Sequence, residues 1–126
     1  MKHAVLIALV LAATAAPALA EGDPIAGKTV FKKCMPCHAL DEKNKVGPSL
    51  ANIIGRPVAS VEGYKYSKAM TTFAEGGRQW NEALLAEYLI SPKALVKGTS
   101  MTFAGLKKLE DIANLTAYLK KPGEAP

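Results

Sequence analysis

The run Cys34-Met35-Pro36-Cys37-His38 constrains the fold of this chain more than any other feature of its sequence. It contains both cysteines of the 126 residues, so a disulfide framework of the kind that staples small exported domains is excluded. C-x-x-C-H is the attachment pattern of c-type haem. Two thiols one turn apart can each add to a vinyl group on the same porphyrin edge, and the adjacent histidine then lies under the iron. The pattern predicts a domain built around one covalently bound haem c.

Two other functions of the cysteines are alternatives to haem attachment. A thioredoxin-like redox pair needs a βαβ context, and no alternating strand pattern occurs in this sequence. A zinc site needs about four ligands, but Cys34, Cys37 and His38 are the only cysteine and histidine residues after position 20. Haem is therefore the favoured interpretation.

Residues 1–20 have the pattern of a secretory signal peptide. Lys2 and His3 precede an unbroken apolar run over 4–13, and Ala18-Leu19-Ala20 supplies a small-x-small cleavage pattern. The run is shorter than the roughly 20 residues that a membrane span requires. We expect cleavage after Ala20 and export to the periplasm, with an uncleaved N-terminal anchor as the alternative.

The remaining residues, 21–126, are enough for one domain with a modest core. Large α/β enzymes, multidomain receptors and repeat arrays are excluded by this length. The formal net charge is +5, but the lysines are spread along the chain, so we expect no nucleic-acid partner. A positive surface that attracts acidic proteins fits the charge better.

Four helices are predicted, from Pro24 into the cysteines, from Ser67 through Phe73, over 82–90 and over about 108–120. Asp23, Ser67 and Asn81 are the expected N-cap residues. Breaks are expected at Gly76-Gly77 and at Pro92.

The apolar spacing also predicts which helix residues are buried. The first helix should bury Ile25, Val30 and Phe31, and the last should bury Leu109, Ile112, Leu115, Tyr118 and Leu119. Residues 41–60, with a short turn around 50–54, and residues 97–105 are aperiodic and are expected to be loops. The chain is thus predicted to be all-α, with long connections organised around the cofactor.

A methionine is the expected ligand on the opposite face of the iron. Met101 lies in an aperiodic loop between Gly98 and Gly105, where the backbone can approach a flat cofactor closely. Met70 falls in a predicted short helix and fits core packing better. A lysine ligand or an empty position remain as alternatives. Histidine with methionine raises the reduction potential and leaves no open position on the iron, so the expected chemistry is transfer of one electron.

Separated motifs then match a known family in order along the chain. They are Gly22-Asp23, Gly27, Phe31, residues 34–38, Gly47-Pro48, Gly55-Arg56, Gly63-Tyr64, Tyr66, Trp80, residues 87–89, Pro92-Lys93, Gly98-Thr99, residues 101–105 and residues 117–119. The sequence resembles class I c-type cytochromes, close to the bacterial cytochrome c2 and mitochondrial cytochrome c type. The resemblance implies a small fold of four to five helices and long loops around one haem.

The resemblance also implies roles for residues around the haem. Pro48 should present its carbonyl to the second ring nitrogen of His38. Tyr66 and Trp80 should hydrogen-bond a haem propionate, with Arg56 close by.

On the methionine side, the resemblance places Tyr88 and Thr99 along the wall, with the phenol of Tyr88 near the Met101 sulfur. It also implies that Gly27 and Phe31 pack against Leu115 and Tyr118, where the first and last helices cross.

The implied function is that of a soluble electron carrier and not of an enzyme. A basic ring around the exposed haem edge would attract acidic redox proteins transiently, and the matching residues are Lys33, Lys45, Lys93, Lys107 and Lys108. The partner could be a membrane oxidoreductase, an oxidase, a photosynthetic reaction centre or a dehydrogenase, and we expect a monomer without a membrane span. Two other classes of haem protein are alternatives: an enzyme or gas sensor with an open haem face, and a haem subunit docked permanently in a larger complex.

Overall fold

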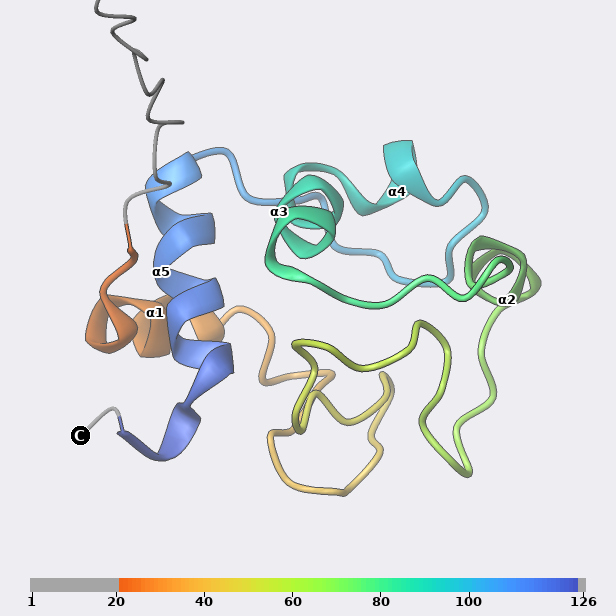
Figure 1. Ribbon diagram of the computed structural model, residues 1–126, viewed down its shortest axis with the longest axis horizontal. Coiled ribbons are helices and arrows are strands. Elements are labelled where there is room, and N and C mark those ends of the chain that lie inside the picture. Colours follow the sequence, from red (N-terminus) through yellow and green to blue (C-terminus); the bar gives the residue numbers. More distant parts are fainter. Residues whose placement is uncertain (1–20, 125–126) are drawn as a thin grey trace, which may run out of the picture.

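The regular structure of this chain is helical. The computed structural model describes residues 21–124, so the predicted signal peptide, residues 1–20, lies outside the described residues, as do residues 125–126. Its elements are α1 (Pro24–Phe31), α2 (Lys68–Phe73), α3 (Glu82–Ile90), α4 (Pro92–Leu95), α5 (Leu109–Lys120) and the 3-10 helix η1 (Pro122–Glu124) (Figure 1). Residues 21–124 contain no strand and only one isolated bridge, between Pro57 and Gln79. The prediction of an all-α domain is confirmed.

The first three helices begin at the predicted cap residues. Asp23, Ser67 and Asn81 each accept a hydrogen bond through their side-chain oxygen from a backbone N–H two or three residues later, at 2.8, 3.1 and 2.8 Å. These bonds satisfy amide groups that have no partner inside the helix. Local chemistry therefore sets where these helices begin.

The first helix is shorter than predicted. α1 ends at Phe31 and does not reach the cysteines; residues 32–37 continue as turns. Cys34 N donates to Phe31 O at 2.8 Å, and His38 N donates to Cys34 O at 2.9 Å. Pro36 has no N–H, so a regular helical ladder cannot continue through it.

Pro92 begins a helix as well as ending one. The sequence predicted only that it terminates α3, but it occupies the first position of α4, where a missing N–H costs nothing. Four residues of α4 are too few to show a period, which is why the pattern did not predict this helix.

α1 and α5 cross closely, as the resemblance implied. A Cβ on Gly27 would lie only 1.9 Å from Asn114 O, so a larger residue does not fit at the crossing. The rings of Phe31 and Tyr118 pack beside it, with centroids 5.6 Å apart and planes tilted by 53°. Asp23 N, just before α1, also donates to the buried Asn114 Oδ1 at 2.7 Å.

Two residues predicted to be buried are exposed. Ile25 is 56% exposed and Leu109 is 73% exposed. Each lies in the first turn of its helix, and the buried face of α5 begins only at Ile112. The apolar spacing of the sequence continues into these first turns, but the buried face of each helix does not.

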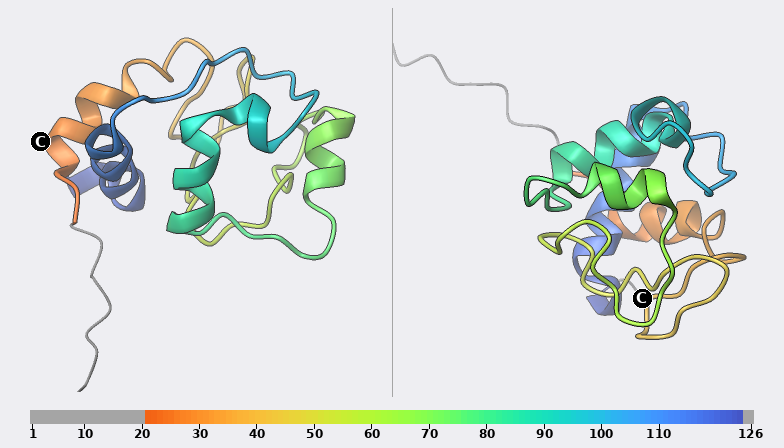
Figure 2. Two further views of the ribbon diagram at one scale, coloured as in Figure 1. Left: turned by 90° about the horizontal axis from the view of Figure 1, so that it is seen from above. Right: turned by 90° about the vertical axis from the view of Figure 1, so that its right-hand side faces the viewer.

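The helices form two groups with long loops between them. Figure 2 shows α1 and α5 together on one side, and α2, α3 and α4 around the other. α5 packs on both α1 and α3 and so joins the groups. No helix within residues 21–124 is long and apolar enough to cross a membrane.

Candidate functional site

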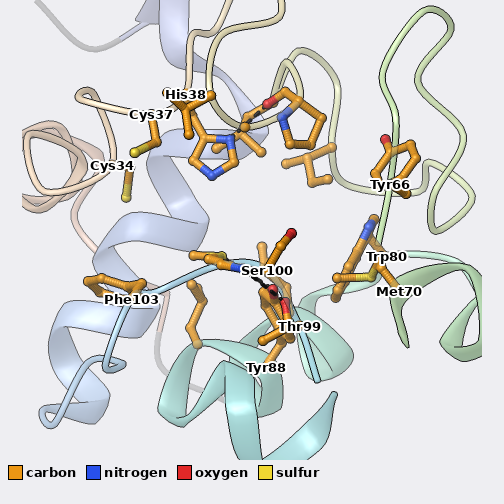
Figure 3. Close-up of a pocket in the computed structure, with 18 of the residues that line it drawn as sticks. Cys34, Cys37, His38, Tyr66, Met70, Trp80, Tyr88, Thr99, Ser100 and Phe103 are labelled. Carbon is orange, nitrogen blue, oxygen red and sulfur yellow. Dashed lines mark hydrogen bonds between the residues drawn. The ribbon is translucent and has the colours of Figure 1, made fainter. Parts of the chain in front are cut away.

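One cavity brings together residues from most of the chain. Its volume is about 320 Å³, and residues from segments 33–38, 46–53, 59–70, 80–89, 99–103 and 115–119 line it (Figure 3). Cys34, Cys37, His38 and Met101 are all among them. The four residues predicted to hold the haem therefore line a common space, although about half of the chain separates Met101 from the others.

The His38 ring is oriented for binding at its outer nitrogen. Nδ1 lies 2.8 Å from Pro48 O; a carbonyl can only accept, so the hydrogen is on Nδ1 and the Nε2 lone pair is free. Figure 3 shows the ring pointing into the cavity. Burial lowers the pKa of His38. The hydrogen bond to Pro48 O acts to raise this pKa, and the positive charges of Lys45 and Arg56 lower it further. The imidazole is therefore neutral, as a metal ligand must be.

Gly47 lies against the same ring. A Cβ at this position would be 2.3 Å from His38 Cε1, so only glycine allows the chain to pass here. Gly47 N also donates to Cys37 O at 2.8 Å. The sequence pattern gave Gly47 no role beyond the motif match, because nothing local indicates that a ring packs on it.

The two thiols lie at one edge of the cavity. Cys34 is half-buried and Cys37 is exposed, and both are free. Burial raises the pKa of the Cys34 thiol, and the nearby charge of Lys33 partly opposes this. In the folded chain, burial thus favours the neutral thiol of Cys34.

On the opposite side, the Met101 sulfur is held by a buried phenol. Tyr88 Oη donates to Met101 Sδ at 3.2 Å, and Met101 N donates to Thr99 Oγ1, also at 3.2 Å. Burial raises the pKa of Tyr88, while a hydrogen bond with Thr99 opposes the rise. All three residues line the cavity, which is the arrangement the resemblance implied for this side.

The residues expected near a propionate are only partly brought together. Tyr66 and Trp80 line the cavity, and Tyr66 Oη accepts from Val61 N at 3.1 Å. Arg56 does not line it; its Nη1 donates to Ala51 O at 2.8 Å. Its buried Nε has no partner among residues 21–124.

Met70 and Tyr64 also line the cavity, although Met70 was expected to pack in the core and Tyr64 was named only in the motif match. Met70 comes from α2 (Figure 3). Tyr64 also lines the cavity and meets Tyr66 edge to face, with ring centroids 4.8 Å apart. The spacing of two between these tyrosines was the available signal, since alternate residues of an extended segment share a side.

The five predicted partner-binding lysines are all exposed, and Lys33 is the one that lines the cavity. Lys45 Nζ donates to Met35 O beside the cysteines at 2.5 Å.

For the zinc alternative, residues 21–124 offer no group of three or more His, Cys, Asp or Glu that could hold a metal ion.

The cavity fits a haem by the chemistry of its walls. It presents two thiols, one imidazole and the thioethers of Met70 and Met101, and thiols, imidazole and thioether are the groups that attach haem c and ligate its iron. Apolar side chains from α3 and α5 make up much of the remaining surface, namely Leu85, Leu89, Leu115 and Leu119. They suit the flat apolar faces of a porphyrin.

Comparison with known proteins agrees with this chemistry. The family model "Cytochrome c" matches residues 25–122. Cytochrome c-554 of Methylosinus trichosporium is 48% identical over 114 residues, which cover 89% of this chain and 84% of that protein. Cytochrome c2 of Blastochloris viridis is 42% identical over 123 residues, which cover 96% and 94%.

A solved structure is similar as well. Cytochrome cH from Methylobacterium extorquens superposes with a TM-score of 0.72 at 37% identity, covering 79% of this chain and 98% of that one. Both the fold and the sequence are thus shared with proteins that carry one covalent haem c and transfer electrons without acting as enzymes. This chain belongs to the cytochrome c family, as a class I c-type cytochrome that resembles bacterial cytochrome c2.

Proposed function

We propose that this chain is a soluble one-electron shuttle of the periplasm, with iron ligated by His38 and Met101. Bound haem supplies an iron that changes between the ferrous and ferric states. Cys34 and Cys37 would hold this group covalently, and His38 and Met101 would ligate its iron and leave no open position for other molecules.

The observation that carries this proposal is that His38 and Met101 line one cavity, in which Tyr88, the donor to Met101, lies across from His38 (Figure 3). The outer nitrogen of His38 is free because Pro48 O takes the hydrogen on Nδ1. The Met101 sulfur accepts one hydrogen bond from Tyr88 and keeps a second lone pair. In the folded chain these hydrogen bonds orient both groups, which lowers the reorganisation needed for electron transfer.

Around this site, we further propose that Tyr66 and Trp80 bind a propionate. Both residues line the cavity. The half-buried Arg56 guanidinium would offset propionate charge, and its buried Nε, which has no partner among residues 21–124, supports this. These contacts fix the orientation of the cofactor within the cavity.

Partner recognition is proposed to occur where Lys33 meets the mouth of the cavity, with the other exposed lysines, Lys45, Lys93, Lys107 and Lys108, extending the positive surface. Its partners are acidic redox proteins, such as a membrane oxidoreductase, an oxidase, a reaction centre or a dehydrogenase. Such encounters are small and short-lived, so the carrier is proposed to be a monomer that leaves each partner after one electron.

Export is proposed to follow from residues 1–20, with cleavage after Ala20. The first helix, α1, starts at Pro24, so cleavage after Ala20 would leave every helix of the domain intact. Intact mass of protein purified from the periplasm tests this step: a mass corresponding to a start at Glu21 with one haem is expected. Retention of residues 1–20 would instead favour an anchored subunit.

The visible spectrum of the reduced protein, with and without carbon monoxide, tests the ligation. We expect a low-spin c-type spectrum that carbon monoxide does not change, because His38 and Met101 occupy both axial positions. A prompt shift would reject closed ligation and favour a gas-binding or enzymatic role.

A further inference from the structure

The carbonyl that fixes His38 belongs to a loop with little packing of its own. Residues 44–48, called here the 44–48 segment, pass over the imidazole, with Gly47 against the ring and Pro48 O at Nδ1. Val46 in the middle of this segment is 78% exposed. Apolar burial therefore does not hold the middle of the segment down, and hydrogen bonds must do so.

Tyr64 supplies one of these bonds from a distant loop. Its Oη donates to Val46 O at 2.8 Å, directly before the glycine that contacts the ring. Tyr64 itself is half-buried, lines the cavity and is braced edge to face by Tyr66, at an interplanar angle of 72°. A fixed ring thus carries a hydroxyl to the least packed point of the 44–48 segment.

A second bond joins the same two loops. Asn44 Nδ2 donates to Glu62 O at 3.3 Å, while Asn44 Oδ1 accepts from Ser49 N at 2.9 Å. Residues 62–64 therefore tie the 44–48 segment at two points, in addition to the bond from Gly47 N to Cys37 O at 2.8 Å. Losing the ties to residues 62–64 would let Pro48 O separate from the imidazole more often.

We propose that Tyr64 is a positioning residue for His38: its hydroxyl holds the 44–48 segment closed, so that Pro48 O keeps its bond to Nδ1. The inference rests on the proposed ligation by His38. A bond at Nδ1 fixes the ring orientation and raises the basicity of the ligand, so Tyr64 acts on the iron without touching it.

Exchange of the His38 Nδ1 hydrogen with deuterium, followed by NMR on the reduced holoprotein, measures this directly. Exchange requires Pro48 O to separate from the ring. Tyr64→Phe removes only the hydroxyl and should speed exchange two- to tenfold, the range that one net hydrogen bond corresponds to. Tyr118→Phe removes a hydroxyl at the α1–α5 crossing and should leave the rate unchanged. Equal rates in Tyr64→Phe and the unmodified protein would overturn the proposal, as would equal acceleration by both variants.

Asn44→Asp gives an independent test through the second tie. It removes the donor to Glu62 O but keeps the oxygen that accepts from Ser49 N, and faster exchange is again expected. If Tyr64→Phe does not retain haem, this variant decides, and an unchanged rate overturns the proposal.

The spectrum of the unmodified protein separates the two proposals. A carbon monoxide-sensitive spectrum rejects the proposed function. A spectrum that carbon monoxide does not change, combined with an unchanged exchange rate of the His38 Nδ1 hydrogen in the variants, rejects only the role of Tyr64.

Discussion

Met101 is held from two directions by side chains that belong to different parts of the chain. Tyr88 of α3 reaches its sulfur, and Thr99 of its own loop accepts from its backbone. A thioether ligand favours ferrous iron. At the scale of single residues, this one sulfur is expected to set both the potential and the closure of the iron.

Met101→Ala should lower the reduction potential by at least about 60 mV, which is a tenfold change in a one-electron equilibrium. It should also let carbon monoxide bind. Redox titration and the visible spectrum measure these changes, with Met35→Ala as the control, because Met35 is 52% exposed and does not line the cavity. An unchanged potential in Met101→Ala would point to Met70 or a lysine as the ligand.

Sequence could predict the residues that carry their own signal. Cys34, Cys37 and His38 form a local motif, and Met101 lies in a loop bounded by glycines. The bond from Tyr64 to Val46 O could not be predicted, because it joins two aperiodic loops whose meeting depends on the whole fold. For the same reason, nothing local showed that Arg56 points toward Ala51 O and away from the cavity lining.

Among the helices, α1 and α5 meet through backbone and not only through side chains. Gly27 lies where a Cβ would come within 1.9 Å of Asn114 O. Alanine normally stabilises a helix relative to glycine by about 1 kcal/mol. Here the clash with a backbone atom should outweigh that preference.

Gly27→Ala should therefore destabilise the holoprotein by about 2 kcal/mol, a typical cost of overpacking. Chemical denaturation monitored by circular dichroism measures the free energy of unfolding. Gly123→Ala is the matched control, because a Cβ there meets nothing within 4 Å and should change stability little. A Gly27→Ala protein as stable as the control would contradict the close crossing.

Helix starts were predictable because a cap depends on one side chain and its own neighbours, as at Ser67 and Asn81. The ends of helices and the exposure of single side chains were harder to predict. α1 stops at Phe31, and Leu109 is exposed in the first turn of α5. Both depend on contacts with distant parts of the chain, and the apolar periodicity of a segment does not show those contacts.

For the molecule as a whole, haem is expected to replace a large part of the core. Residues of α3 and α5 turn apolar side chains, such as Leu85 and Leu115, toward the cavity and not only toward each other. A chain with Cys34→Ala and Cys37→Ala together should lose most of its helical circular dichroism signal, since binding energy supplies folding energy. A cooperative unfolding transition in this haem-free variant would contradict the expectation.

The net charge of +5 also acts at this scale. Electron transfer with an acidic redox protein should slow as salt rises, because screening shortens the reach of the field. Lys33→Glu, at the mouth of the cavity, should slow it further at low salt, several-fold more than Lys120→Glu, whose lysine is paired with Glu82 at 2.5 Å. Stopped-flow rates over a salt series measure both effects, and a salt-independent rate would argue against electrostatic attraction.

The methionine loop is attached to α3 as well as facing the cavity, through Leu106 N, which donates to Leu89 O at 2.7 Å, and through Tyr88. Under the proposed ligation by His38 and Met101, the chain between them would form a closed ring, and the iron would act as a crosslink whose strength depends on oxidation state. Thermodynamic linkage would then require reciprocity: the ferrous protein would resist opening of residues 97–105 more than the ferric one, and any force that loosens them would make the iron harder to reduce. A partner that pulls on residues 97–105 while docking would thereby favour release of the electron it is about to receive.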